Sequence, residues 1–131
     1  MLNSFYNNIR TEQLRRKLEE VGPFYFYNTE LLKATLERIS ESIKDAPNFH
    51  VHYAIKANSN PRILKLISNA NFGADCVSGG EIIAAIENGF VPQSIVFAGV
   101  GKSDREIHDA MMLGIEAFNC ESLQEIFVIN E

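Results

Sequence analysis

One stretch of sequence decides how this chain folds: HVHYAIKANSNP, residues 50–61. Its first half predicts a β-strand, because β-branched or aromatic side chains recur at alternate positions, namely Val51, Tyr53 and Ile55. Its second half is polar and turn-prone, and Asn60 followed by Pro61 is typical of the N-cap and first turn of a helix. The stretch therefore predicts a strand, a loop and the start of a helix.

Lys56 lies where this strand passes into the loop. In parallel α/β folds, the loops that follow the strands form the mouth of the functional site. A lysine placed there can be desolvated, which lowers its pKa and frees the amine to attack a carbonyl. The position alone favours a solvated lysine at the end of a strand, so other parts of the chain must decide between the two.

The pattern of a strand followed by a helix recurs along the chain. Strand-like runs begin every 21–22 residues, near Val51, Gly73, Ser94 and Ile115. Helical patterns follow them at residues 62–69, 80–88, 104–113 and from 123 onward. This alternation predicts right-handed βαβ units and a parallel sheet, with the strands 51–55, 73–77, 94–98 and 116–119 in sequential order.

Start and stop signals support these helices. The capping pattern Ser-x-x-Glu, in which the two side chains satisfy each other's backbone N–H groups, occurs three times, at residues 78–81, 103–106 and 122–125. Gly89 and Gly114 stand where helix C-caps belong. Upstream of the repeat, the sequence predicts helices over residues 10–20 and 30–44, with a compact aromatic strand over residues 24–27 between them.

The strand runs 95–98 and 76–77 are almost entirely apolar, which predicts that both faces of the sheet are buried. The fold class is therefore α/β, and a doubly wound sheet or a barrel would both fit. A complete (β/α)8 barrel needs eight units and about 250 residues. Since only four units are visible, we expect the chain to be a piece of a longer protein.

Composition narrows the class of protein. The 131 residues correspond to about one domain, and 46% hydrophobic with 22% charged residues is a globular composition. A net charge of -5 without a cluster of Lys and Arg argues against a nucleic-acid surface. No run of 18 apolar residues and no signal peptide is present, which predicts no membrane span. Cys76 and Cys120 lie far apart and form no CxxC, which fits a reducing cytoplasm.

Several polar residues should meet at one rim of the sheet, where the strands end: Lys56, Asp75 with Ser78, residues 99–102 and Asn119. Asp75 should have a cationic partner, because an unpaired buried charge is costly, and that partner could serve function or structure alike. Gly79-Gly80 could offer free backbone N–H groups to a ligand or simply form a tight turn. GVGKS, residues 99–103, lacks the glycine spacing of a P-loop.

The histidines are weaker candidates. His50 and His52 are alternate residues of one strand, a spacing that metals can use, but no third ligand is in sight and a core or strand-edge role is favoured. His108 lies on a predicted helix and should be exposed. The sequence therefore predicts no metal site.

Three motifs carry a resemblance to a known family: HYAIKAN at residues 52–58, GADCVSGGE at 73–81 and FAGVGKS at 97–103. Their order and spacing resemble the alanine-racemase-like, fold-type III class of pyridoxal-phosphate decarboxylases. Within that class, the second and third motifs resemble the diaminopimelate decarboxylase branch. The resemblance covers the chain from about Gly22 to its end and continues through FNCES at residues 118–122.

The resemblance implies a fold and a site. Residues 48–131 would be the first half of a pyridoxal-phosphate-binding TIM-type barrel, and residues 1–47 a helix, a strand and a helix leading into it. The strand at 24–27 would belong to a C-terminal β-domain and stand apart from the parallel sheet. Lys56 would carry pyridoxal 5'-phosphate as a Schiff base, Asp75 would lie beside the cofactor, and Ala54 would leave room for its ring.

The resemblance also implies an activity: decarboxylation of meso-2,6-diaminopimelate to L-lysine and CO2, the last step of lysine biosynthesis, in a cytoplasmic homodimer. Two alternatives stay open. One is another decarboxylase of the class, acting on ornithine, arginine or carboxynorspermidine, and the other is a non-catalytic pyridoxal-phosphate-binding fragment. We expect the isolated 131-residue chain to be inactive and to self-associate, because an open half barrel exposes strand edges and apolar surface.

Overall fold

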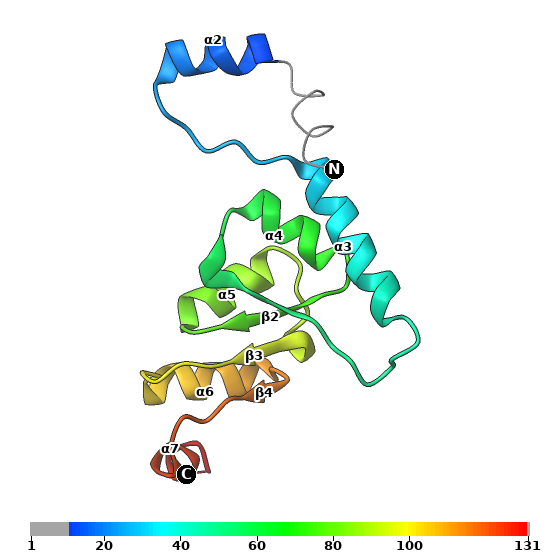
Figure 1. Ribbon diagram of the computed structural model, residues 1–131. Helices are drawn as coiled ribbons and strands as arrows, with labels where there is room; N and C mark the ends of the chain where they lie inside the picture. Colours follow the sequence, from blue (N-terminus) through cyan, green and yellow to red (C-terminus); the bar gives the residue numbers. More distant parts are fainter. Residues whose placement is uncertain (1–10, 131) are drawn as a thin grey trace.

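A computed structural model describes residues 11–130 of the chain (Figure 1). Four short strands form one sheet: β1 (His52–Ala54), β2 (Gly73–Cys76), β3 (Ile95–Phe97) and β4 (Ala117–Phe118). Six α-helices accompany them in the described part: α2 (Thr11–Val21), α3 (Thr29–Ile43), α4 (Pro61–Ser68), α5 (Gly79–Glu87), α6 (Asp104–Leu113) and α7 (Leu123–Asn130). Short 3-10 turns, η1 (Ile55–Ala57) and η2 (Pro92–Ser94), follow β1 and precede β3.

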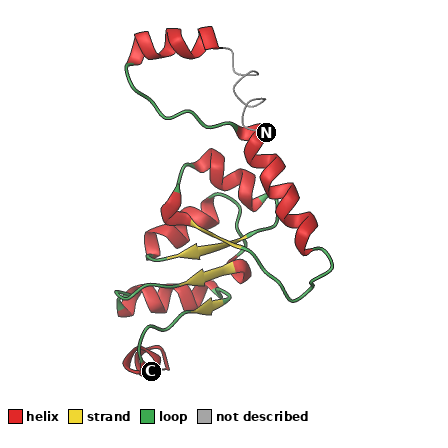
Figure 2. Ribbon diagram, viewed as in Figure 1, coloured by secondary structure: helices red, strands yellow, loops and turns green. Residues whose placement is uncertain are grey.

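The sheet has the predicted topology. All three strand pairings are parallel, and the strands lie in the order β1-β2-β3-β4. A helix connects each strand to the next, so the chain is a series of βα units (Figures 1 and 2). The predicted α/β fold class and the sequential order of its strands are therefore confirmed.

One face of the sheet forms the core. Side chains on this face are fully buried, namely Ala74, Cys76, Ile95 and Phe97. Helices α4 and α5 supply the residues that pack on them, such as Leu64, Ile67 and Ile82. Burying this layer is the main driving force for the fold, at about 25 cal/mol for each Å² of apolar surface removed from water.

The opposite face is different. Ala54, Asp75 and Val96 are neighbours in register across β1, β2 and β3, and the residues that the structure describes bury them only partly. The prediction that both faces are buried is wrong for this part of the chain. The helices of the βα units pack on one side of the sheet, which leaves the second side open. We call this second side the open face.

The helix caps follow the prediction in part. At α6, Ser103 and Glu106 form the full reciprocal box. At α5 and α7 the serine accepts the expected backbone N–H, but the glutamate reaches one residue further back: Glu81 accepts from Val77 N at 2.8 Å, and Glu125 accepts from Glu121 N at 2.7 Å. Two of the three predicted boxes are therefore only half formed.

Glycines permit two features of the sheet and its connections. Gly114 is the C-cap of α6, with φ at 68°, as predicted. The C-cap of α5 is Asn88, and Gly89 follows it with φ at 93°, so that prediction is wrong by one residue. Gly73 lets the His52 ring lie directly over β2, because a Cβ at this position would come within 2.3 Å of His52 Cδ2.

The predicted aromatic strand at residues 24–27 is wrong. These residues form an extended connection between α2 and α3, drawn as a loop in Figure 2. A strand needs a neighbour for its backbone hydrogen bonds, and no described segment pairs with this one. The segment does lie outside the parallel sheet, as predicted, and its side chains are exposed, with Tyr25 at 89%.

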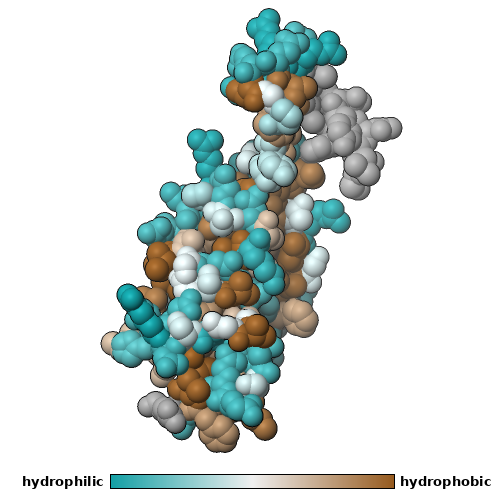
Figure 3. Space-filling view, turned by 90° about the vertical axis from the view of Figure 1, so that its left-hand side faces the viewer, coloured by the Kyte–Doolittle hydropathy of each residue, from teal (hydrophilic) through white to brown (hydrophobic). Residues whose placement is uncertain are grey.

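Apolar side chains also reach the surface on α7, where Leu123 is 73% and Phe127 69% exposed. Figure 3 shows apolar groups interspersed among polar ones over one face of the molecule. This exposure agrees with the open half barrel on which the self-association prediction depends, and that prediction stays untested. None of the helices in residues 11–130 has the length and apolar character needed to cross a bilayer.

Candidate functional site

Lys56 stands at the carboxyl end of β1, in the 3-10 turn η1 that follows the strand directly. The neighbouring Ile55 is fully buried and anchors this turn to the core, whereas Lys56 itself is exposed. No hydrogen bond or ion pair joins Lys56 Nζ to any other residue that the structure describes. The amine is therefore free to react with a group that enters from solvent.

Asp75 lies on the open face of β2, and its Cα is paired with that of Ala54 across the ladder. Its Oδ1 atom is buried and has no hydrogen-bond partner among the described residues. The prediction of a cationic partner is wrong for this part of the chain, because the residues level with Asp75 on both sides are the apolar Ala54 and Val96. A buried acceptor without a partner is rare in folded proteins and marks a place where a ligand or water belongs.

The structure pairs two of the three residues that sequence analysis assigned to the site, Ala54 and Asp75, and the third, Lys56, follows shortly after Ala54 in the chain. Ala54 is two positions before Lys56 and directly beside Asp75, on the same open face. Its methyl side chain leaves space above the sheet between the lysine turn and the carboxylate. Ser78 is not part of this group, because its Oγ accepts from Glu81 N at 3.3 Å as the N-cap of α5.

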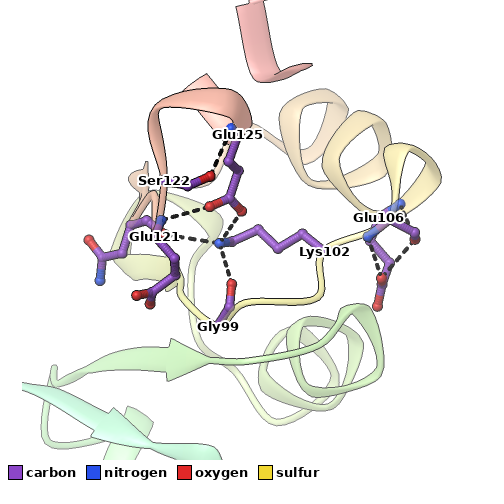
Figure 4. A network of polar contacts seen from close by, with 8 residues as sticks. Gly99, Lys102, Glu106, Glu121, Ser122 and Glu125 are labelled. Atoms are coloured by element: carbon purple, nitrogen blue, oxygen red, sulfur yellow. Dashed lines mark hydrogen bonds and ion pairs between the residues drawn. The ribbon is translucent and has the colours of Figure 1, made fainter. Parts of the chain in front are cut away.

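A second lysine lies on the same rim in a very different setting (Figure 4). The side chain of Lys102, in the connection from β3 to α6, is 0% exposed. Its ammonium donates to Gly99 O at 2.7 Å, Asn119 O at 2.9 Å and Glu125 Oε1 at 2.7 Å. It also lies 5.5 Å from the centre of the Phe97 ring. All three of its N–H groups are used, so Lys102 is a structural clamp between the ends of β3, β4 and α7.

The start of α5 is closed in a similar way. Gly79 N, one of the N–H groups that could have been free, donates to Glu106 Oε1 at 2.8 Å. The same carboxylate also accepts hydrogen bonds from Ser103 N and Ser103 Oγ. These bonds lower the pKa of Glu106, and the bond from Gly79 N contributes most. The structure therefore favours a tight, capped turn at Gly79 over an open binding loop.

His52 and His108 lie away from the rim that carries Lys56. His52 bonds through Nε2 to Glu116 Oε2 at 2.8 Å, at the amino end of the strands and away from Lys56. His108 is exposed on α6, as predicted. No cluster of three or more metal-ligating side chains occurs within residues 11–130. Cys76 and Cys120 are free, and burial raises the pKa of the Cys76 thiol to about 12, so this thiol stays protonated at neutral pH.

Sequence reasoning placed Lys102 on the rim but missed its role. The signal that could have revealed it is Glu125, the third residue of α7, which a capping box would direct toward the same rim. The three acceptors come from three segments of the chain, and only the folded structure brings them together.

Comparison with known proteins shows similarity to pyridoxal-dependent decarboxylases. The family model described as "Pyridoxal-dependent decarboxylase, pyridoxal binding domain" matches residues 31–131. A diaminopimelate decarboxylase of Bacteroides thetaiotaomicron is 52% identical over 109 residues, which are 83% of this chain and 28% of that protein. The corresponding enzyme of Aquifex aeolicus is 43% identical over 109 residues, covering 83% of this chain and 25% of that protein.

The chain is also similar to solved structures of diaminopimelate decarboxylases. Diaminopimelate decarboxylase from M. jannaschii, in complex with L-lysine, aligns with a TM-score of 0.81 and 36% identity over 88% of this chain and 28% of that one. The enzyme from Helicobacter pylori, also complexed with L-lysine, aligns with a TM-score of 0.71 and 38% identity over 88% of this chain and 29% of that one. The chain thus spans less than a third of the length of these relatives.

Proposed function

This chain belongs to the pyridoxal-dependent decarboxylases, as part of their pyridoxal-binding domain, and we propose that it carries the cofactor lysine of an enzyme that converts meso-2,6-diaminopimelate to L-lysine and CO2. One observation carries the proposal. Of the two lysines that follow strands on the rim in the described part of the chain, Lys56 is exposed and makes no hydrogen bond or ion pair there, whereas the side chain of Lys102 is buried and fully bonded.

The residues present fit pyridoxal phosphate. The cofactor offers an aldehyde, for which a free amine such as that of Lys56 is the matching nucleophile. It also carries a hydroxyl group that can donate a hydrogen bond, which suits the orphaned Asp75 Oδ1. Ala54 is small enough for a flat ring to approach the sheet between them. The chemistry of this set of residues therefore supports the family's cofactor.

Each residue has a proposed part in the reaction. Bound pyridoxal phosphate supplies an electron sink that lets a carboxylate leave as CO2. Lys56 would hold the cofactor covalently through Nζ, which must be neutral to attack and is kept free of ion pairs. Asp75 would accept a hydrogen bond through Oδ1 at the same place, and Ala54 would leave the space open. Glu81 and Ser78 keep their structural part at the start of α5.

The domain division is also a proposal. In the full-length protein, residues 48–131 would form the first half of the cofactor barrel, and the open face of the sheet would line its interior. Residues 1–47 would lead into it, with the exposed aromatic side chains at 24–27 covered by a C-terminal β-domain. A cytoplasmic homodimer is the assembly that we propose for the complete enzyme.

The substrate assignment depends on similarity. The relatives described above are named diaminopimelate decarboxylases, at 36–52% identity. An ornithine decarboxylase of Entamoeba histolytica aligns at only 28% identity over 74% of this chain, with a TM-score of 0.63. The higher identity to the first group favours diaminopimelate over ornithine or arginine.

The test is made on the full-length protein loaded with pyridoxal phosphate. Borohydride reduction followed by peptide mapping should place the cofactor on the peptide with Lys56, and Lys56→Ala should carry none. Lys65→Ala, which removes an exposed lysine of α4, is the matched control and should label as the wild type does.

Release of CO2 is then measured with meso-diaminopimelate, ornithine and arginine as separate substrates. We expect turnover of meso-diaminopimelate alone. Cofactor attached to Lys102 would refute the site, turnover of ornithine or arginine instead would refute the substrate, and no turnover of any of the three would favour a non-catalytic role.

A further inference from the structure

The turn that carries Lys56 is held by bonds on both sides of the lysine. Asn58 N donates to Ile55 O at 3.1 Å, which closes the 3-10 turn around Lys56. The hydroxyl of Tyr53, on β1, donates to Asn58 O at 3.3 Å. Burial, and then the nearby Tyr27, raise the pKa of Tyr53, so its phenol remains a donor at neutral and mildly alkaline pH.

The side chain of Asn58 ties the same turn to the next helix. Its Oδ1 accepts from Asn60 N at 2.9 Å, a local bond in which an asparagine side chain stands in for the backbone of a turn. Asn60 in turn caps α4 by accepting from Arg62 N at 3.0 Å. The Asn58 backbone is extended, with φ at −168°, so the position does not require an asparagine for its conformation. What the side chain contributes is the bond to Asn60.

We infer that Asn58 is a positioning residue for Lys56, an inference that rests on the proposed function. The Lys56 side chain has four flexible bonds and no hydrogen bond or ion pair with the described residues that would orient it. The position from which the Lys56 side chain extends is therefore fixed only by the backbone of its turn. A reacting group held in place gains rate over one that must search for its position. Asn58 provides this by joining the turn to β1 through Tyr53 and to α4 through Asn60.

The inference is tested by the rate at which the full-length, cofactor-free protein attaches pyridoxal phosphate, followed by absorbance and fixed by borohydride. Asn58→Ala removes the side-chain bond and should slow attachment to Lys56 about tenfold, the change expected for the net loss of one hydrogen bond. Asn58→Ser offers a shorter neutral acceptor that can form a similar turn, and should recover most of the rate.

The matched control is Asn28→Ala. Asn28 caps α3 by accepting from Leu31 N at 3.0 Å, so this variant loses the same kind of bond at a distance from Lys56 in the chain. Both alanine variants should lower Tm by similar amounts, but only Asn58→Ala should slow attachment. A purely structural role for Asn58 would lower Tm and leave the attachment rate unchanged.

Tyr53→Phe gives an independent measurement, since it removes one hydroxyl and keeps the ring. Its bond to Asn58 O is long at 3.3 Å, so we expect attachment to slow only about twofold to threefold. If Asn58→Ala is too unstable to measure, this variant decides, and a wild-type rate overturns the inference.

The two proposals fail in different ways. Attachment at Lys56 with unchanged rates in Asn58→Ala refutes only the positioning role. Attachment at another lysine in the wild-type protein refutes the proposed function itself.

Discussion

The ends of β1 and β3 each present a lysine to the same rim, yet the two side chains are used in opposite ways. Lys56 is exposed and has no bonding partner in the described part of the chain, whereas Lys102 is fully buried and makes three bonds. A strand-end position therefore does not by itself make a lysine reactive. What matters is whether the surrounding chain supplies acceptors for all its N–H groups.

Electrostatics explains the difference. A buried ammonium is stable only when its charge is paired and its donors are satisfied, and Glu125 with two carbonyls meets that need for Lys102. The amine of Lys102 is occupied by these three acceptors and is therefore not available to a ligand. Lys56 Nζ makes no hydrogen bond or ion pair with the described residues, and Asp75 Oδ1 has no partner among them, so both groups remain available to a ligand.

The largest expected effect comes from removing Lys56, the proposed cofactor lysine. Lys56→Ala should abolish covalent attachment of pyridoxal phosphate in the full-length protein, because Lys102, the other lysine that follows a strand on the described part of the rim, is fully bonded. The free energy of unfolding should change by less than about 0.5 kcal/mol, as for other exposed substitutions. Peptide mapping after borohydride reduction measures the attachment of the cofactor. Urea denaturation of the cofactor-free protein measures the free energy of unfolding. A residual label at Lys102 would mean that its clamp opens in solution.

Removing the buried lysine should have the reverse effect. Lys102→Met keeps the length of the side chain but leaves two carbonyls and a carboxylate without their donor. Breaking a buried pair from one side costs of order 3 kcal/mol, so the urea midpoint should fall clearly. Below that midpoint, Lys56 should still take up the cofactor.

Lys65→Met is the matched control for this variant, because Lys65 is an exposed lysine of α4. Its urea midpoint should stay close to that of the wild type. Equal midpoints for Lys102→Met and Lys65→Met would show that the clamp contributes nothing to stability.

The fold was predictable from sequence where the signals are local. Apolar periodicity and caps predicted α6 at residues 104–113, and the other helices and strands to within about two residues, since each depends on neighbours in the chain. The aromatic segment 24–27 was not predictable in this way. Its β-like composition describes a propensity, but a strand forms only where a partner strand accepts its hydrogen bonds.

The place of the candidate residues in the sheet was predictable, but their contacts were not. Motif and strand ends predicted that Lys56, Ala54 and Asp75 lie on one rim, and the ladder pairs Ala54 with Asp75. That Asp75 lacks a cation depends on which residues are level with it, and register is a property of the sheet. The Lys102 clamp likewise draws acceptors from three separate segments, which periodicity in one segment cannot reveal.

The smallest expected effects concern how the stability of the protein depends on pH, and they test the ion pair that distinguishes Lys102 from Lys56. Bonds from Lys102, then from Glu121 N, lower the pKa of Glu125, and bonds from Gly79 N and Ser103 lower that of Glu106. A carboxyl whose folded pKa lies below its unfolded value of about 4.3 binds fewer protons in the folded state. It therefore adds stability above about pH 4.3, and that stability is lost as the pH falls through the folded pKa.

We therefore expect the urea midpoint of the full-length, cofactor-free protein to fall as the pH is lowered from 6 to 3. Glu125→Gln and Glu106→Gln should each lower the midpoint at pH 6 and flatten its decline, because an amide does not titrate. Glu37→Gln is the control, since this exposed glutamate of α3 shows no bond to other described residues and should keep the wild-type profile. If Glu125→Gln also kept that profile, Lys102 would be held by its carbonyl acceptors alone, and the contrast with Lys56 would depend on burial rather than on the ion pair.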